Sequence, residues 1–282
     1  MASTMWDLIF GLAGGLGLFL LGFSLMGQGL QNIVGDRIRF FLERTSNPLT
    51  ALATGFFMTL TLQEAGAATV LLIGLLGSGL IRLKQGICMM LGVNLGVTLL
   101  VHLTTLRLGS YALVAVGLGF LIYSFGKQRS SQYLGYLTLG FGLVFIGLNI
   151  LTAAMKPLVE QILWQGSLPQ NLLLPFSGFF LGFLMTALLQ NNLATIGLLQ
   201  AFVSQAALSG EGVTFLQLPV FLPFLLGTGL GVCVTASLTA TKDNILIRRA
   251  VWAHWLIIGA TNFGLLLLVR PLAGLVNWTT LR

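Results

Sequence analysis

The chain has 282 residues, of which 56% are hydrophobic and 7% are charged, and its formal net charge is +7. A soluble globular domain would carry about 25% charged residues, so this composition excludes one and favours a membrane protein. The basic residues are scattered between apolar runs without a basic face, which argues against nucleic acid as a partner. Neither the two cysteines nor any nucleophile–base pair indicates a metal site, a cofactor or an enzyme.

The first predicted unit covers residues 1–130 and contains one interrupted apolar segment. Two short apolar arms meet at Gln63 and Glu64, and each arm is short for a bilayer, which needs about 20 apolar residues per helix. The segment before them mixes charged residues with apolar ones at helical spacing, which predicts an interfacial helix; a plain cytoplasmic loop is the alternative. In chain order, the predicted elements are a span at 8–30, the interfacial helix at 31–47, the interrupted segment at 49–81, and spans at 86–106 and, only just, 110–126.

The second predicted unit, residues 131–282, has a similar order of elements. Its interrupted segment is broken at Gln190, Asn191 and Asn192. Irregular backbone at membrane depth persists only where protein or a water-filled cavity satisfies it, so both interrupted segments fit re-entrant helical hairpins. The elements of this unit are a span at 133–155, the interrupted segment at 172–208, and spans at 218–240 and 250–270.

Two sequence repeats relate the halves. Gly55-Phe-Phe-Met-Thr-Leu-Thr-Leu-Gln63 recurs as Gly182-Phe-Leu-Met-Thr-Ala-Leu-Leu-Gln190, and Gly15-Leu-Gly-Leu-Phe-Leu-Leu-Gly22 resembles Gly140-Phe-Gly-Leu-Val-Phe-Ile-Gly147. Internal repeats with polar breaks in apolar segments are typical of secondary transporters, in which two halves meet around one midplane site.

The basic residues predict the orientation. With the N-terminus outside, ten of them fall inside and four outside, as the positive-inside rule requires. The first hairpin then opens to the inside and the second to the outside, so the halves are inverted. We therefore predict an all-α polytopic membrane protein of two inverted-topology repeats, each with a re-entrant helical hairpin, in the inner or plasma membrane.

Most of the chain resembles the bacterial sodium–phosphate cotransporter family, which is related to the animal type II sodium–phosphate cotransporters. The resemblance rests on both hairpins and on the stretches Gly17 to Leu30, Gly35 to Arg39, Thr45 to Pro48 and Arg248 to His254. It implies two inverted repeats, each with a Gln-Ser-Ser-Ser-Ala-Thr tip followed by a Gly-Ala-Asn-Ile-Gly-Thr-Thr helix. It also implies sodium-driven transport of phosphate through those serines and the neighbouring backbone.

This sequence departs from the family pattern at both tips. They read Gln63-Glu64-Ala65-Gly66 and Gln190-Asn191-Asn192-Leu193, so all six serines are absent. The helix signature survives in part after the first tip, with Asn94 and Thr98, but loses its asparagine after the second. Helix N-termini that face each other would still attract an anion, with sodium as the candidate coupling ion. The candidate binding residues are Gln63, Glu64, Ala65, Gly66, Asn94, Thr98, Gln190, Asn191 and Asn192.

Glu64 leaves the function open. If it is ionised, it repels a bound anion by about 4 kcal/mol per unit charge at 4 Å and an effective dielectric near 20. It is a neutral acid, a cation ligand or a structural partner, and no basic residue lies within either hairpin to pair with it. One hypothesis is a transporter of inorganic phosphate or another small anion with altered substrate or ion preference. The other is a transport-inactive homologue that serves as a structural or accessory subunit of a larger membrane protein complex.

Overall fold

A computed structural model describes residues 2–43, 47–106, 108–164, 175–208, 218–239, 245–268 and 271, and within these ranges every regular element is a helix. In chain order the elements are α1 (Ala2–Glu43), α2 (Pro48–Leu62), α3 (Ala65–Gly77), α4 (Leu83–Thr105), the 3₁₀ turn η1 (Gly109–Tyr111), α5 (Ala112–Phe125), α6 (Arg129–Ala154), α7 (Lys156–Trp164), α8 (Pro175–Leu189), α9 (Asn192–Leu208), α10 (Leu218–Thr239) and α11 (Ile245–Leu267).

Five of the six predicted membrane spans are confirmed by length and composition. In the described part of the chain, the apolar helices long enough to cross a membrane are Trp6–Ile33, Leu83–Thr105, Arg129–Glu160, Phe221–Leu238 and Ile245–Leu267. The sixth segment, 110–126, falls among the shorter apolar helices, because α5 has only 14 residues. The 3₁₀ turn at Gly109–Tyr111 precedes α5, and the extended backbone of Gly126 ends it.

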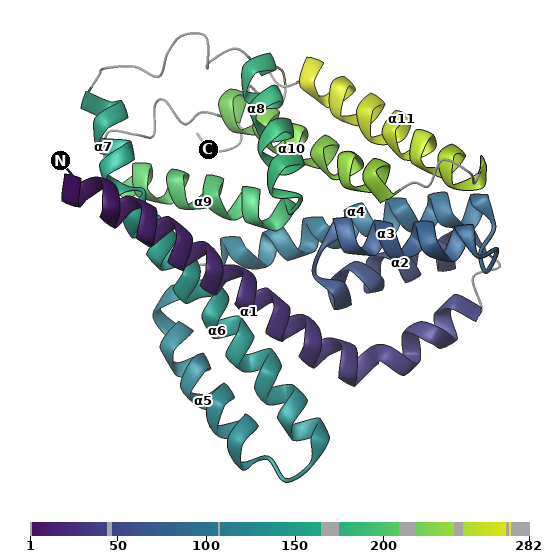
Figure 1. Cartoon of the computed structure of the whole chain (residues 1–282), viewed down its shortest axis with the longest axis horizontal. Helices are drawn as coiled ribbons and strands as arrows, with labels where there is room; N and C mark the ends of the chain where they lie inside the picture. Colours follow the sequence, from purple (N-terminus) through teal and green to yellow (C-terminus); the bar gives the residue numbers. More distant parts are fainter. Residues whose placement is uncertain are drawn as a thin grey trace.

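Residues 31–43, predicted as part of an interfacial helix, continue α1 without interruption. The helix changes direction toward its C-terminal end (Figure 1). The side chains beyond Ile33 lie outside the described residues. Their position at a membrane interface therefore stays a prediction.

The two helices that carry the similar glycine segments, α1 and α6, pack directly against each other. A Cβ added to Gly22 would lie 2.7 Å from the carbonyl oxygen of Gly140, and one added to Gly140 would lie 2.5 Å from the carbonyl oxygen of Gly22. Gly15 and Gly147 have the same reciprocal relation, at 3.1 and 2.7 Å. Only glycine permits this approach of the backbones. Helices α5 and α6 form a hairpin that extends from the rest of the molecule (Figure 1).

A second contact occurs once in each half. A Cβ on Gly55 of α2 would overlap the carbonyl oxygen of Met89 in α4, and a Cβ on Gly182 of α8 would overlap that of Phe224 in α10. Near the end of α2, the Cβ of Thr59 lies 2.7 Å from the position that a Cβ would take on Gly96 of α4. Near the end of α8, the Cβ of Thr186 lies 2.5 Å from the corresponding position on Gly231 of α10. The paired helices α2–α4 and α8–α10 thus place the two breaks in equivalent positions.

Candidate functional site

The first helix break lies at the residues predicted from the sequence. Helix α2 ends at Leu62, Gln63 adopts a left-handed conformation (φ 56°, ψ 20°), and its N–H donates to the carbonyl of Thr59 at 2.6 Å. A left-handed backbone costs a residue other than glycine about 1–2 kcal/mol. Glu64 is extended and serves as the N-cap residue of α3, which begins at Ala65. The backbone therefore stops one helix and starts another within two residues.

The second break repeats this backbone geometry. Gln190 has φ 51°, and its N–H donates to the carbonyl of Thr186 at 2.8 Å. Among the described residues other than glycine, Gln63 and Gln190 alone have positive φ. Helix α9 begins two residues later, at Asn192. The Oδ1 atom of Asn191 accepts a hydrogen bond from the N–H of Ala194 at 2.9 Å, which is the geometry of a helix N-cap.

The two breaks meet in space. The position that a Cβ would take on Gly66, in the first turn of α3, is 3.7 Å from the carbonyl oxygen of Gln190. The same position is 3.5 Å from Cγ2 of Thr235 in α10 and 3.2 Å from Oε1 of Glu64. We call this region the junction: Glu64 and Gly66 from the first break, Gln190 from the second, and Thr235. It joins chain segments that are more than 120 residues apart in the sequence.

Among the described residues, four buried oxygen atoms on the broken helices have no hydrogen-bond partner. One is Oε1 of Gln200, whose Nε2 donates to the carbonyl of Thr104, and the other three belong to buried residues. These three are Oε1 of Gln63, Oγ1 of Thr69 and Oδ1 of Asn192. Their residues are 5%, 0% and 7% exposed. Because buried polar atoms are normally paired, such atoms are candidates to coordinate a cation or to accept from a bound solute. The side chain of Gln63 also packs toward Gly27 of α1, with its Cγ 3.8 Å from the position a Cβ would take there.

Asn94 and Thr98, the other predicted site residues, form hydrogen bonds within α4. Asn94 Nδ2 donates to the carbonyl of Met90 at 2.9 Å, and Thr98 Oγ1 donates to the carbonyl of Asn94 at 3.0 Å. Nδ1 of His102 lies 2.7 Å from the carbonyl of Thr98. Side-chain bonds of this kind back to the preceding turn are ordinary in helices. These hydrogen bonds do not link Asn94 or Thr98 to the junction.

Two contacts near the breaks were not predicted. Gln31 of α1 donates from Nε2 to the carbonyl of Thr61 at 3.3 Å, in the last turn before the first break. Thr186 donates to Oγ1 of Thr195 at 3.1 Å and so ties α8 to α9 across the second break. Thr59, the equivalent of Thr186 in the first half, instead donates to the carbonyl of Gly55 one turn earlier. Only the pairing of two helices brings Thr195 within reach of Thr186.

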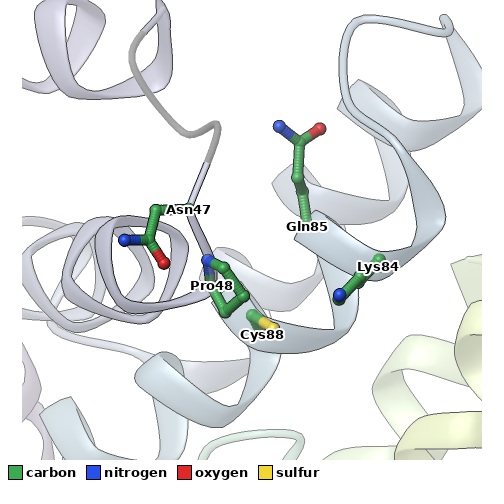
Figure 2. A pocket seen from close by; sticks show the side chains of 5 residues that line it. All are labelled: Asn47, Pro48, Lys84, Gln85 and Cys88. Atoms are coloured by element: carbon green, nitrogen blue, oxygen red, sulfur yellow. The ribbon is translucent and has the colours of Figure 1, made fainter.

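A small surface pocket of about 60 Å³ lies at the other end of α2. Figure 2 shows the side chains that line it, from the beginnings of α2 and α4: Asn47, Pro48, Lys84, Gln85 and Cys88. A helix of 15 residues is about 22 Å long, so this pocket is remote from Gln63. It is not part of the junction.

These helices define a multi-pass helical membrane protein, and comparison with known proteins shows which family part of the chain matches. A family model described as Na+/Pi-cotransporter matches residues 18–153. This match covers just under half of the chain, and it agrees with the family resemblance found in the sequence. This is a family of transporters and not of enzymes.

The similar curated proteins are distant relatives. "Uncharacterized protein YqeW" of Bacillus subtilis is 26% identical over 84% of this chain and 74% of its own length. "Putative inorganic phosphate export protein YjbB" is 24% identical in Salmonella typhimurium and 25% in Escherichia coli K12, over 92% and 82% of this chain. The chain spans 47% and 41% of the lengths of these two YjbB proteins. No solved structure matches this chain.

Proposed function

We propose that this chain is a secondary transporter that moves inorganic phosphate, or another small anion, through the junction between its two helix breaks. The observation that carries the proposal is the 3.7 Å separation between the Gly66 Cβ position and the carbonyl oxygen of Gln190. It brings the first turn of α3 beside the residues that open α9. The first N–H groups of a helix lack partners within the helix, and the helix dipole favours negative charge there. Two neighbouring helix N-termini therefore suit an anion.

The duplicated packing supports an inverted-repeat arrangement. The reciprocal glycine contacts of α1 with α6, and the matched contacts of α2–α4 and α8–α10, are those expected of two related halves. In transporters built from inverted repeats, the binding site lies at the repeat interface and is formed by discontinuous helices. In this arrangement the N-terminus is outside, the first hairpin opens to the inside and the second opens to the outside.

Three of the buried oxygens without partners, those whose residues are themselves buried, are the candidate ligands for a coupling ion. Oε1 of Gln63, Oγ1 of Thr69 and Oδ1 of Asn192 would offer sodium the oxygen donors that hard cations prefer. The names of the YjbB relatives make phosphate the first solute to test and outward movement the first direction. Because all six family serines are absent from the tips, we propose a solute or ion preference different from that of the family.

One observation favours the alternative, a transport-inactive accessory subunit. At the second break, Asn191 caps its own helix and Thr186 bonds Thr195. Polar groups that could bind a solute are thus engaged in holding the break together. A subunit with only a structural role would keep these bonds and need no others.

Phosphate flux in proteoliposomes distinguishes the two functions. We expect the full chain to move labelled phosphate well above empty liposomes, and Gln63→Ala to reduce the rate about tenfold or more. Gln128→Ala is the matched control, because this exposed residue precedes α6 and makes no side-chain cap bond. No flux of phosphate, sulfate or arsenate with or without a sodium gradient, from protein that remains folded, would establish the accessory role instead.

A further inference from the structure

We propose that Glu64 takes up one proton when an anion enters the junction and releases it when the anion leaves, so that anion and proton cross the membrane together. The inference rests on the proposed transport function. It assigns to this chain a coupling group in place of a serine of the family tip. The step makes and breaks only the bond between the proton and the carboxylate oxygen, with water on either side of the membrane as donor and acceptor.

The position of the carboxylate is the first argument. Glu64 is the N-cap residue of α3, yet its side chain makes no cap hydrogen bond. Its Oε1 lies 3.2 Å from the position of a Cβ on Gly66, which is itself 3.7 Å from the carbonyl oxygen of Gln190. The half-buried carboxylate therefore lies at the junction, where the anion would bind. Asn191 occupies the equivalent place in the second break, and its side chain accepts the hydrogen bond that caps α9.

The second argument is that the described residues supply no charge that neutralises Glu64. Helices α2, α3, α8 and α9 contain no charged or titratable residue. The described titratable groups on the other helices packed against α3 are Lys84, Cys88 and His102 on α4, Cys233 on α10, and Arg248, Arg249 and His254 on α11. Lys84 and Cys88 line the remote pocket, and Cys233 Sγ lies 3.9 Å from Nδ1 of His254. None of these groups forms an ion pair with Glu64.

The remaining described groups do not change this result. His102 is exposed and bonds its own helix, and Arg248 and Arg249 are exposed on α11. Arg82, the N-cap residue of α4, is exposed and follows the opposite end of α3 from Glu64. Within the described ranges, the one ion pair joins Lys156 to Glu160. The carboxylate of Glu64 and an incoming anion would thus share the positive end of α3, and no described basic residue pairs with Glu64 there. Two like charges at one such position exclude each other, and a proton on Glu64 removes that repulsion.

The experiment measures how many protons move with each phosphate. Proteoliposomes with a trapped pH dye receive labelled phosphate in sodium-free buffer at a fixed pH, and the proton and phosphate fluxes are recorded together. Phosphate carries its own protons, so the comparison is between variants at the same pH. We expect Glu64→Gln to lower the proton-to-phosphate ratio by one, whatever its absolute rate. Glu160→Gln, an exposed carboxylate on α7, should keep the ratio of the unmodified protein.

The unmodified protein provides a test that needs no variant. An inside-alkaline pH gradient in sodium-free buffer should drive phosphate into the liposomes. The uptake should be about tenfold higher than without the gradient. An unchanged ratio in Glu64→Gln, or no effect of the gradient on the unmodified protein, would overturn proton coupling and leave phosphate transport standing. If the unmodified protein shows no phosphate flux either with or without sodium, transport and coupling are both refuted.

Discussion

The two helix breaks share a backbone and differ in what their side chains do. Gln63 and Gln190 both end a helix in the left-handed conformation, yet Gln63 is buried and Gln190 is exposed. The following residue is a self-satisfied cap in one case, Asn191, and a carboxylate without a cap bond in the other, Glu64. Both breaks therefore have the same backbone conformation although the side chains that follow differ. The residue after the glutamine can cap the next helix, as Asn191 does, or leave that helix uncapped, as Glu64 does.

The largest expected effect concerns the faces from which the two breaks are reached. Cys88 is partly exposed beside the start of α2, and Cys233 is buried with 0% exposure. A membrane-impermeant maleimide should therefore label native Cys88 only from the inner face. In a Cys88→Ser background, which should itself stay unlabelled, Phe176→Cys at the start of α8 should react only from the outer face. Labelling of both sites from the same face would contradict the inverted arrangement.

The next effect tests whether the two halves pack alike. Gly55→Ala and Gly182→Ala should each destabilise the protein by about 1–3 kcal/mol, because the new methyl group overlaps a backbone carbonyl of the partner helix. Gly74→Ala is the control: nothing lies near its Cβ position, and alanine in a helix should be neutral or stabilise by up to about 1 kcal/mol. Thermal unfolding in one detergent measures all three. A loss at Gly55 with none at Gly182 would break the equivalence of the halves.

A smaller effect separates the two residues that follow the breaks. Asn191→Ala should cost about 1 kcal/mol, because the N–H of Ala194 loses its acceptor. Asn191→Asp keeps an oxygen in place and should restore most of this loss. Glu64→Ala should cost no capping energy, because the carboxylate makes no cap bond. Equal losses in unfolding free energy for Asn191→Ala and Glu64→Ala would contradict the division of roles.

The smallest effect is at the left-handed residues. Gln190→Gly should stay within about 0.5 kcal/mol of the unmodified protein, since relief of a strain of about 1–2 kcal/mol offsets the added freedom of the unfolded chain. Gln63→Gly should be less stable than Gln190→Gly, because the buried Gln63 side chain packs beside Gly27. Parallel denaturation curves test the order. A more stable Gln63→Gly would show that its side chain contributes no packing.

The sequence was sufficient to locate both breaks and five of the spans, for a simple physical reason. A run of apolar residues marks a membrane helix, and polar residues such as Gln63 and Asn191 in the middle of such a run mark the position of a break. The length of α5 depends instead on local backbone geometry at Gly109–Tyr111 and Gly126, which hydropathy does not report. The 110–126 segment was therefore predicted as too long a helix.

The candidate site was less accessible from the sequence. That Gly66 approaches Gln190 and Thr235 follows from the packing of α3 against α10, and no local pattern encodes a contact over such a separation. The cap formed by Asn191 had a local signal, an asparagine directly before a helix start. Glu64 had a different signal, a carboxylate at the break of an apolar segment, but the sequence did not show that its side chain makes no cap bond. The roles of Asn94 and Thr98 as ion ligands stay predictions, because their hydrogen bonds lie within α4.

Cross-linking the two halves at the junction is the most direct test of a shared transport route. Gly66→Cys and Thr235→Cys, in a Cys88→Ser background, place two thiols where the Gly66 Cβ position and Thr235 Cγ2 are 3.5 Å apart. We predict that an oxidant or mercuric ion links these two thiols, so that neither is detected by mass labelling. The link should stop phosphate flux until a reductant is added. The same treatment should not change the flux of either single variant. A linked protein that transports phosphate at the unlinked rate would show that the solute does not pass between the helix breaks.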